Sequence, residues 1–360
     1  MSAIHQFVAG FTEYDAISNE ACIFQGFFRN WGYKSEIFSD APHISKANSR
    51  KAKDIHDAAE SISENDLVLL HLSIGSTIND FFAQFLCRKA ILYHNMTPAH
   101  YFQGIQEELA GKLAWGRKQL HSLNRTSSIV LADSQFNAEE LKVAGYQNVC
   151  ILPLLLDFKA VRRKPDRKTL HMLQDGLVNI LFVGRCVPNK RLEDILNAFY
   201  YFQKFVEPNS RLICIGSTVG MERYEMILWT LTRNLELENV LFAGTVSAEV
   251  LSAYYQAAHV FLCMSEHEGF CIPLLESMIH DVPVLAYATA AVPETLSGAG
   301  ILFCEKRFDL IAEMIGKLTT NIPFRKAVIQ KQRERLQSYE HCDVEAELKN
   351  YLLPIMPELK

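Results

Sequence analysis

Residues 178–205, VNILFVGRCVPNKRLEDILNAFYYFQKF, decide the fold class. The stretch opens with the apolar run VNILFVG, passes through a short polar loop and continues as LEDILNAFYYFQKF, which has helical periodicity. An apolar run without polar alternation is typical of a strand that is buried on both faces of a parallel sheet. The stretch therefore predicts a strand–loop–helix unit of an α/β fold.

The same unit recurs along nearly the whole chain. The predicted strands are 4–10, 66–72, 89–95, 128–133 and 148–153 in the first half, and 178–184, 211–217, 239–244, 259–264 and 283–288 in the second. Amphipathic stretches between them predict helices, among them 17–31, 137–145, 192–205 and 248–258. The charged segment 159–170 contains proline and is predicted to be a linker. We expect two doubly wound domains, residues 1–160 and 161–340, that face a central cleft.

The C-terminal residues 341–360 are predicted to return to the first domain. A helix over 341–356 would place Val344, Leu348, Leu352 and Ile355 on one apolar stripe. Such a stripe is suited to packing on a domain surface.

Composition limits the class of protein. A chain of 360 residues suits two domains, and an apolar fraction of 49% with 21% charge is ordinary for a globular protein. The net charge of −5 gives no basic field for nucleic acid. Nine scattered cysteines without a C-x-x-C pair indicate neither a disulfide framework nor a zinc site. With no apparent signal peptide and no apolar run of about 20 residues, we expect a cytoplasmic protein.

Candidate ligand residues follow the strands of the first half, because open parallel sheets bind ligands at the carboxyl ends of their strands. Gly10 follows the first strand and allows close approach of a ligand to the backbone. Asp15 and Ser18 are suited to capping the next helix, and the capped turn is the favoured interpretation. His94 ends a later strand, where a structural histidine is the commoner case.

In the second half, Gly184-Arg185-Cys186-Val187-Pro188-Asn189-Lys190 joins a strand to a helix. It lacks the P-loop spacing, and the chain contains no G-x-G-x-x-G, which argues against a dinucleotide dehydrogenase. Arg185 and Lys190 place two cations near a helix N-terminus, an arrangement that suits a diphosphate. A solvated loop with two charges explains this stretch equally well.

Two glutamates, Glu268 and Glu276, stand at either end of EGFCIPLLE. Pro273 suits the first turn of a helix, so the amides of residues 269–272 would lie at the helix N-terminus and meet an anion. A carboxylate at Glu276 can accept hydrogen bonds from paired hydroxyls, as on a ribose. The alternative is one solvent-facing acid and one acid that caps the helix. A glycosidase pair is disfavoured, because it needs two carboxylates across one bond.

With these motifs the chain resembles the retaining glycosyltransferases of family 4 (glycosyl transferases group 1). EGFCIPLLE is similar to the E-x7-E signature of that family, and VGRCVPNKRLEDILNAF is similar to its phosphate-binding strand, loop and helix. GFTEYDAISNEA and YHNMTPAHYF, in the first half, look like a subgroup of it. The resemblance implies the GT-B fold, with two Rossmann-like domains, and a hexosyltransferase that uses a nucleotide-diphosphate sugar.

The resemblance also implies roles for individual residues. Arg185 and Lys190 would hold the donor diphosphate, Glu268 the transferred sugar, Glu276 the ribose, and His94 the sugar from the first domain. The remaining implied donor contacts are Gly10, Gly184, Thr245, Val246, Gly269, Phe270, Cys271 and Ile272. His94, Glu268, Arg185 and Lys190 would form the catalytic set. Family members often have two adjacent glycines in the first loop, whereas here Phe11 follows Gly10.

The expected reaction needs no metal and no cofactor. No D-x-D is present, so Arg185, Lys190 and the helix end would take the place of a metal. The base of the donor, UDP- or GDP-linked, and the glycan or lipid-linked acceptor stay open. Lys112, Arg117, Lys118 and Arg125 suit contact with anionic lipid, although a solvated helix face is favoured. A non-catalytic nucleotide-sugar binding module and a nucleotide-sugar epimerase or hydrolase are the alternatives.

Overall fold

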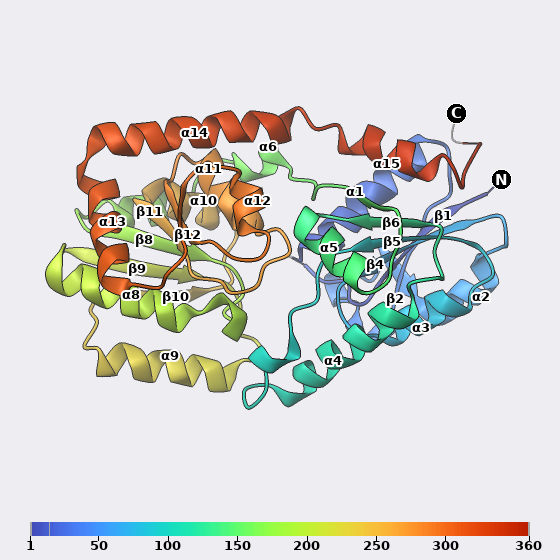
Figure 1. The fold of residues 1–360 in the computed structure, drawn as a ribbon, viewed down its shortest axis with the longest axis horizontal. Helices are drawn as coiled ribbons and strands as arrows, with labels where there is room; N and C mark the ends of the chain where they lie inside the picture. Colours follow the sequence, from blue (N-terminus) through green and yellow to red (C-terminus); the bar gives the residue numbers. More distant parts are fainter. Residues whose placement is uncertain (1, 14, 359–360) are drawn as a thin grey trace. The chain divides into compact units, whose positions relative to one another are not determined.

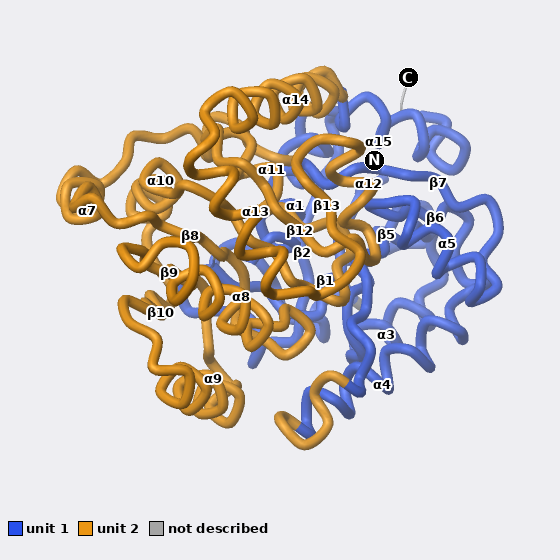
Figure 2. Tube along the Cα trace, turned by 60° about the vertical axis from the view of Figure 1, so that its left-hand side comes forward, with its two compact units in different colours: residues 1–100, 107–155, 343–360 blue, residues 101–106, 156–342 orange. Residues whose placement is uncertain are grey.

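The computed structural model describes residues 2–13 and 15–358. The chain forms two compact units, shown in Figure 2. Unit 1 contains residues 1–100, 107–155 and 343–360, and unit 2 contains residues 101–106 and 156–342. The chain thus leaves unit 1 shortly before the predicted limit at residue 160, and the short segment 101–106 was not expected in unit 2.

Unit 1 is built on a seven-stranded parallel sheet with the order β3-β2-β1-β4-β5-β6-β7. Its strands are β1 (Ile4–Val8), β2 (Ile37–Ser39), β3 (Ala52–Asp54), β4 (Leu67–Leu72), β5 (Arg88–Tyr93), β6 (Ile129–Ala132) and β7 (Val149–Ile151). The five strands predicted in this half are confirmed, whereas β2 and β3 were missed. Every residue of β1 and β4 is buried, as expected for central strands of a parallel sheet.

Helices cover both faces of this sheet (Figure 1). The helices of unit 1 are α1 (Ala16–Asn30), α2 (Ala58–Ser61), α3 (Thr77–Gln84), α4 (Glu107–Ser122), α5 (Gln135–Val143) and α15 (Val344–Leu352). Helix α1 begins at a cap, because Asp15 Oδ2 accepts hydrogen bonds from Ser18 N at 2.8 Å and Ser18 Oγ at 2.7 Å. The predicted capped turn is confirmed.

Helix α15 belongs to unit 1, as its apolar stripe predicted. Val344, Leu348 and Leu352 are buried, but Met356 takes the fourth buried position that was expected for Ile355. Trp31 Nε1 donates a hydrogen bond to Glu345 Oε1 at 2.9 Å. The C-terminal helix therefore packs on α1.

Unit 2 is built on a six-stranded parallel sheet with the order β10-β9-β8-β11-β12-β13. Its strands are β8 (Val178–Val183), β9 (Ser210–Ile215), β10 (Val240–Gly244), β11 (Val260–Cys263), β12 (Val284–Tyr287) and β13 (Ile301–Phe303). The five strands predicted in this half are confirmed, and β13 was missed.

The helices of unit 2 lie on both sides of its sheet, with α8 and α9 on one side and α10 and α11 on the other (Figure 1). They are α6 (Phe158–Val161), α7 (Arg167–Leu173), α8 (Leu192–Phe205), α9 (Glu222–Asn234), α10 (Ala248–Ala257), α11 (Ile272–Ile279), α12 (Val292–Leu296), α13 (Phe308–Thr320) and α14 (Ile322–Glu340). The linker predicted at 159–170 is wrong, because α6 and part of α7 occupy this segment within unit 2. Ser252 Oγ donates a hydrogen bond to the Arg163 carbonyl, which ties the segment to α10.

Each sheet has one point at which the strand order reverses. In unit 1 this switch point lies between β1 and β4, and in unit 2 it lies between β8 and β11. The loops that follow these strands are where a doubly wound sheet binds its ligand.

The four cations for which contact with lipid was the less favoured alternative lie on or after α4. Lys112 Nζ lies 2.8 Å from Glu108 Oε1, and Arg117 pairs with Glu140 and the Met96 carbonyl. Two of the four cations are therefore already paired within unit 1. In the described part of the chain, no helix combines the length and the apolar character needed to cross a membrane.

Candidate functional site

The two loops at the switch point of unit 2 are joined by an ion pair between Lys190 and Glu268. Lys190 ends the short 3-10 helix Pro188–Lys190 that follows β8, and Glu268 lies in the loop after β11. Lys190 Nζ lies 2.6 Å from both carboxylate oxygens of Glu268. The structure thus joins two residues that the sequence placed in separate roles.

This pair lies partly out of solvent. The Lys190 side chain is 20% exposed and that of Glu268 is 7% exposed. Burial acts to lower the pKa of Lys190, but the charge of Glu268 outweighs it, so the pKa of the ammonium lies above its ordinary value. Lys190 is therefore a firmly protonated cation whose present partner is a carboxylate.

Further hydrogen bonds and ion pairs fix the two loops against each other. Asn189 Nδ2 donates to the His267 carbonyl at 3.0 Å, and Glu266 N donates to the Asn189 carbonyl at 2.8 Å. Lys306 Nζ lies 2.6 Å from Asp194 Oδ2 and 2.7 Å from Glu266 Oε1, which links the first turn of α8 to the second loop. The site is therefore a preformed surface.

Helix α11 begins directly after the Glu268 loop. Cys271 is the cap residue and adopts a left-handed conformation with φ 73°, and the helix starts at Ile272 with Pro273 in its first turn. A left-handed non-glycine residue is uncommon and tends to occur at functional sites. The predicted helix start is confirmed, and it puts residues 269–272 at the positive end of the helix dipole.

Glu276 lies one turn further into α11, and its hydrogen-bond partner differs from those of the Lys190–Glu268 pair. Tyr255 Oη, from α10, donates to Glu276 Oε2 at 2.7 Å. Burial raises the pKa of the Glu276 carboxyl, and the hydrogen bond from Tyr255 opposes that rise. Tyr255 was not predicted as a site residue. The only indication of it in the sequence is a hydroxyl-bearing side chain within a largely apolar helix.

The other predicted residues of unit 2 lie on loops at the same edge of the sheet. Gly184 and the exposed Arg185 follow β8, and Thr245 and Val246 follow β10. Gly216, which follows β9, was not predicted from the sequence. It has φ 147°, and a Cβ there would lie 1.9 Å from the Gly184 carbonyl oxygen, so only glycine lets the two loops pack this closely.

Gly10 and His94, the two site residues predicted in unit 1, lie in different surroundings. Gly10 follows β1 in an ordinary conformation, and a Cβ there would meet only the His43 carbonyl oxygen at 3.9 Å. His94 follows β5, and its side chain is only 3% exposed. Its ring nitrogens face Glu20, His71 and Asp133, three residues that the sequence did not bring together.

Among the described residues, two sets of side chains have the ligand types of a metal site: Cys263, Glu268 and Cys271, and Glu20, His71 and His94. In the first set the Glu268 carboxylate already holds the ammonium of Lys190. In the second, His71 Nδ1 and His94 Nε2 are 2.9 Å apart. The expectation of no metal stays a prediction.

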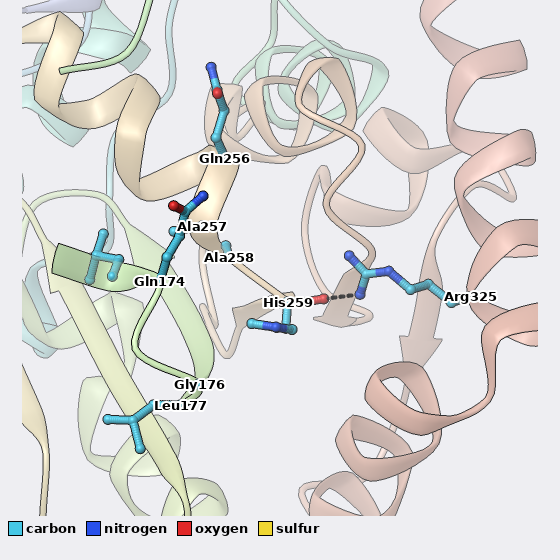
Figure 3. Close-up of a pocket in the computed structure, with 9 residues that line it drawn as sticks. Gln174, Gly176, Leu177, Gln256, Ala257, Ala258, His259 and Arg325 are labelled. Atoms are coloured by element: carbon cyan, nitrogen blue, oxygen red, sulfur yellow. Dashed lines mark hydrogen bonds between the residues drawn. The ribbon is translucent and has the colours of Figure 1, made fainter. Parts of the chain in front are cut away.

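A pocket of about 440 Å³ lies elsewhere in unit 2 (Figure 3). Its lining includes Leu177 and His259, which precede β8 and β11, and Arg325, which donates to the His259 carbonyl. The pocket therefore lies at the amino ends of the strands, opposite the edge that bears Lys190 and Glu268.

Comparison with known proteins decides the family of this site. Residues 171–335 match the model of the family "Glycosyl transferases group 1", a range that includes Arg185, Lys190, Glu268 and Glu276. Unit 2 belongs to the glycosyl transferases group 1. The predicted family resemblance is thereby confirmed.

This chain has distant relatives. It is 24% identical to O-antigen chain mannosyltransferase B of Escherichia coli over 241 residues, 64% of this chain and 62% of the relative. It is 28% identical over 141 residues to the GDP-mannose:cellobiosyl-diphosphopolyprenol alpha-mannosyltransferase of Xanthomonas oryzae, 39% of this chain and 37% of the relative. The chain thus spans less than two thirds of the length of these relatives.

The fold likeness extends over the whole chain. Sucrose-phosphate synthase from Thermosynechococcus elongatus has a TM-score of 0.76 at 17% identity, with 100% of both chains covered. Together with the two parallel α/β units, this likeness confirms the predicted GT-B fold class.

Proposed function

We propose that this chain is a hexosyltransferase that moves a sugar from a nucleotide-diphosphate sugar to a glycan or lipid-linked acceptor. The observation that supports it best is the Lys190–Glu268 pair at the switch point of unit 2, next to the N-terminus of α11. This edge offers a fixed cation, a carboxylate and a helix dipole within two adjoining loops. A diphosphate and a sugar with hydroxyl groups match that set of groups.

In this proposal the donor diphosphate takes over Lys190 from Glu268. The ammonium then turns from a carboxylate to a phosphate, and the exposed Arg185 adds a second cation on the same loop. Glu268, released from its partner, accepts hydrogen bonds from the hydroxyls of the transferred sugar. Glu276 accepts those of the ribose, and Thr245 and Val246 lie against the base.

The chemistry follows from where charge develops. When the bond between the sugar and the diphosphate breaks, negative charge grows on the leaving diphosphate. Lys190, Arg185 and the amides at the start of α11 are fixed beforehand, so they stabilise that charge with little reorganisation. We therefore propose transfer without a metal ion, and with retention through attack on the face from which the diphosphate leaves.

The names of the relatives favour one donor. One of them uses GDP-mannose and a diphosphopolyprenol acceptor, and another is a mannosyltransferase of O-antigen chains. We propose GDP-mannose as the donor and a lipid-linked glycan as the acceptor. A cytoplasmic enzyme at the membrane surface would reach both substrates.

A donor panel tests the proposal. The purified chain is incubated with GDP-mannose, UDP-glucose and related donors, with and without a synthetic polyprenyl-diphosphate sugar, in the presence and absence of EDTA. We expect acceptor-dependent release of GDP that EDTA leaves unchanged, and NMR of the product should show the anomeric configuration of the donor. Turnover without acceptor would favour a hydrolase or epimerase, and nucleotide binding without turnover would favour a binding module.

A further inference from the structure

A buried polar cluster lies below the strand ends of unit 1, where the sequence predicted only His94. Its members come from five elements: Gln6 in β1, Glu20 in α1, His71 in β4, His94 after β5 and Asp133 after β6. The side chains of Glu20, His71, His94 and Asp133 are 0 to 3% exposed. Burying an ionisable group is costly unless it has a partner, so the contacts among these side chains determine which of them are charged.

The two imidazole rings lie in one plane and meet edge to edge. Their planes differ by 3°, His71 Nδ1 and His94 Nε2 are 2.9 Å apart, and the ring centroids are 5.2 Å apart. The distance between the ring centroids equals the distance between the two nitrogens plus the centroid-to-nitrogen distance within each ring. The two centroids and the two nitrogens therefore lie on one line, and each nitrogen points directly at the other. This is the geometry of a linear N–H···N hydrogen bond. A zinc ion between the two would need about 2.0–2.1 Å on each side, so the gap is too short for it.

The direction of that hydrogen bond follows from Gln6. Gln6 Nε2 lies 2.8 Å from the Ala21 carbonyl oxygen, which can only accept, so the amide nitrogen must face it. Gln6 Oε1 consequently faces His71 Nε2 at 2.9 Å and can only accept. His71 therefore bears its proton on Nε2, its Nδ1 is the acceptor, and the proton between the rings belongs to His94 Nε2.

We propose that Gln6 and His71 are positioning residues that hold the proton of His94 on Nε2, so that His94 gains and loses charge only at Nδ1, opposite Asp133. The inference rests on the proposed function, together with the contact to the transferred sugar that the family resemblance implies for His94. It deepens that function by naming the residues that set the orientation and protonation of this imidazole.

The charges around His94 agree with this assignment. Asp133 Oδ2 lies 3.6 Å from His94 Nδ1, Glu20 Oε2 lies 3.5 Å from Nε2, and Asp15 at the cap of α1 adds a more distant negative charge. Burial acts to lower the pKa of His94, but these acids outweigh it and the net shift is upward. Burial and the neighbouring His94 lower the pKa of His71, which keeps it a neutral acceptor. Burial raises the pKa of Glu20 to about 7.

Imidazole NMR tests the proton positions directly, without reference to activity. Long-range ¹H–¹⁵N spectra of the ¹⁵N-histidine-labelled full chain are assigned with His71→Asn and His94→Gln. We expect His71 to remain neutral with its proton on Nε2, and His94 Nε2 to stay protonated while Nδ1 titrates. A proton on His71 Nδ1, or joint titration of both rings, would overturn the inference.

Substitutions test the effect on transfer. Asn at position 71 keeps an acceptor in the place of Nδ1, so His71→Asn should retain most of the turnover. His71→Leu removes the 2.9 Å acceptor of the His94 Nε2–H and leaves only Glu20 Oε2 at 3.5 Å, so turnover should fall roughly tenfold to a hundredfold, the scale of one poorly satisfied buried polar group. A general loss of folding would affect both variants alike, and thermal melts of the two monitor it.

Gln6→Glu offers a reversal of the hydrogen-bond chain. A carboxylate next to His71 Nε2 favours a charged His71, which would donate from Nδ1 to His94. The ionisation of His94 seen in the pH profile of kcat should then move to lower pH, whereas Gln25→Glu, which removes a similar amide-to-carbonyl bond to Ser35, should leave it in place. An unchanged profile in Gln6→Glu refutes the positioning role. Absence of transfer by the parent chain would refute the proposed function instead, and the NMR result would still stand.

Discussion

The carboxyl edges of the two sheets use charge in opposite ways. In unit 2, Lys190 and Glu268 form one tight ion pair that is partly open to solvent, so an incoming anion can exchange with the carboxylate. In unit 1, the ionisable groups around His94 are almost entirely buried and bonded in a chain that begins at Gln6. The difference indicates that unit 2 supplies replaceable charge for a ligand, whereas unit 1 holds a proton in a fixed place.

The largest effect is expected from the cations of unit 2. Arg185→Ala and Lys190→Ala should each lower turnover on the order of 10²-fold or more, because each removes a preorganised stabiliser of the leaving diphosphate. Steady-state kinetics with GDP-mannose and acceptor measure this. Lys204→Ala, an exposed residue near the end of α8, is the matched control and should keep its rate.

The two substitutions should differ in their effect on the stability of the fold. Lys190→Ala leaves the buried Glu268 carboxylate without its ammonium, which destabilises the fold, whereas Arg185 is exposed, so its removal should cost less. Thermal melts should show a larger decrease in Tm for Lys190→Ala than for Arg185→Ala. Near-normal turnover in the double variant would place the diphosphate elsewhere.

Glu268→Gln should separate binding from transfer. The amide no longer holds the Lys190 ammonium by charge, so affinity for the bare nucleotide diphosphate should stay the same or increase. Sugar transfer should fall roughly tenfold to a hundredfold, since a charged hydrogen-bond acceptor is lost at the sugar. Calorimetry with GDP and kinetics with GDP-mannose measure the two effects. A loss of GDP affinity as large as the loss of turnover would contradict this assignment.

Glu276→Gln should act on nucleotide binding, by about tenfold in Kd, as expected for removing charge from one hydrogen bond. The amide can still accept from Tyr255, so the local structure should persist. Tyr255→Phe is the matched control, because it removes the hydrogen bond but keeps the carboxylate. If Tyr255→Phe weakens GDP binding more than Glu276→Gln does, the ribose contact is wrong.

The sequence predicted the parts of the fold that depend on local pattern. Long apolar runs marked ten strands, whereas β2, β3 and β13, with three residues each, were missed. The equally short β7 was predicted because its apolar run extends over residues 148–153. Lys190 and Glu268 were each predicted as donor-site residues, because each follows a strand. Their ion pair was not predicted, because it depends on β8 and β11 being neighbours at the switch point. The partners of His94 were not predicted either, because they lie on four other elements. Their only trace in the sequence is a polar residue within an apolar strand, Gln6 in β1 and His71 in β4.

Of the substitutions considered, Glu20→Gln should have the smallest effect on transfer. Its effect on stability tests the buried cluster of unit 1. In the folded chain, burial raises the pKa of Glu20 from 4.5 to about 7, so the folded state binds this proton more tightly than the unfolded state does. The contribution to stability is therefore fully present below pH 4.5 and is lost as pH rises through about 7. Gln is isosteric and keeps an acceptor for the Leu155 amide, but it does not ionise. Relative to the parent chain, Glu20→Gln should thus gain stability between pH 5 and pH 8, by roughly 1–3 kcal/mol for a shift of this direction and size. Denaturant unfolding of the full chain at both pH values measures it. A difference between the two chains that is the same at pH 5 and pH 8 would mean that Glu20 is ionised throughout, and the tighter proton binding of Glu20 in the folded chain would have to be abandoned.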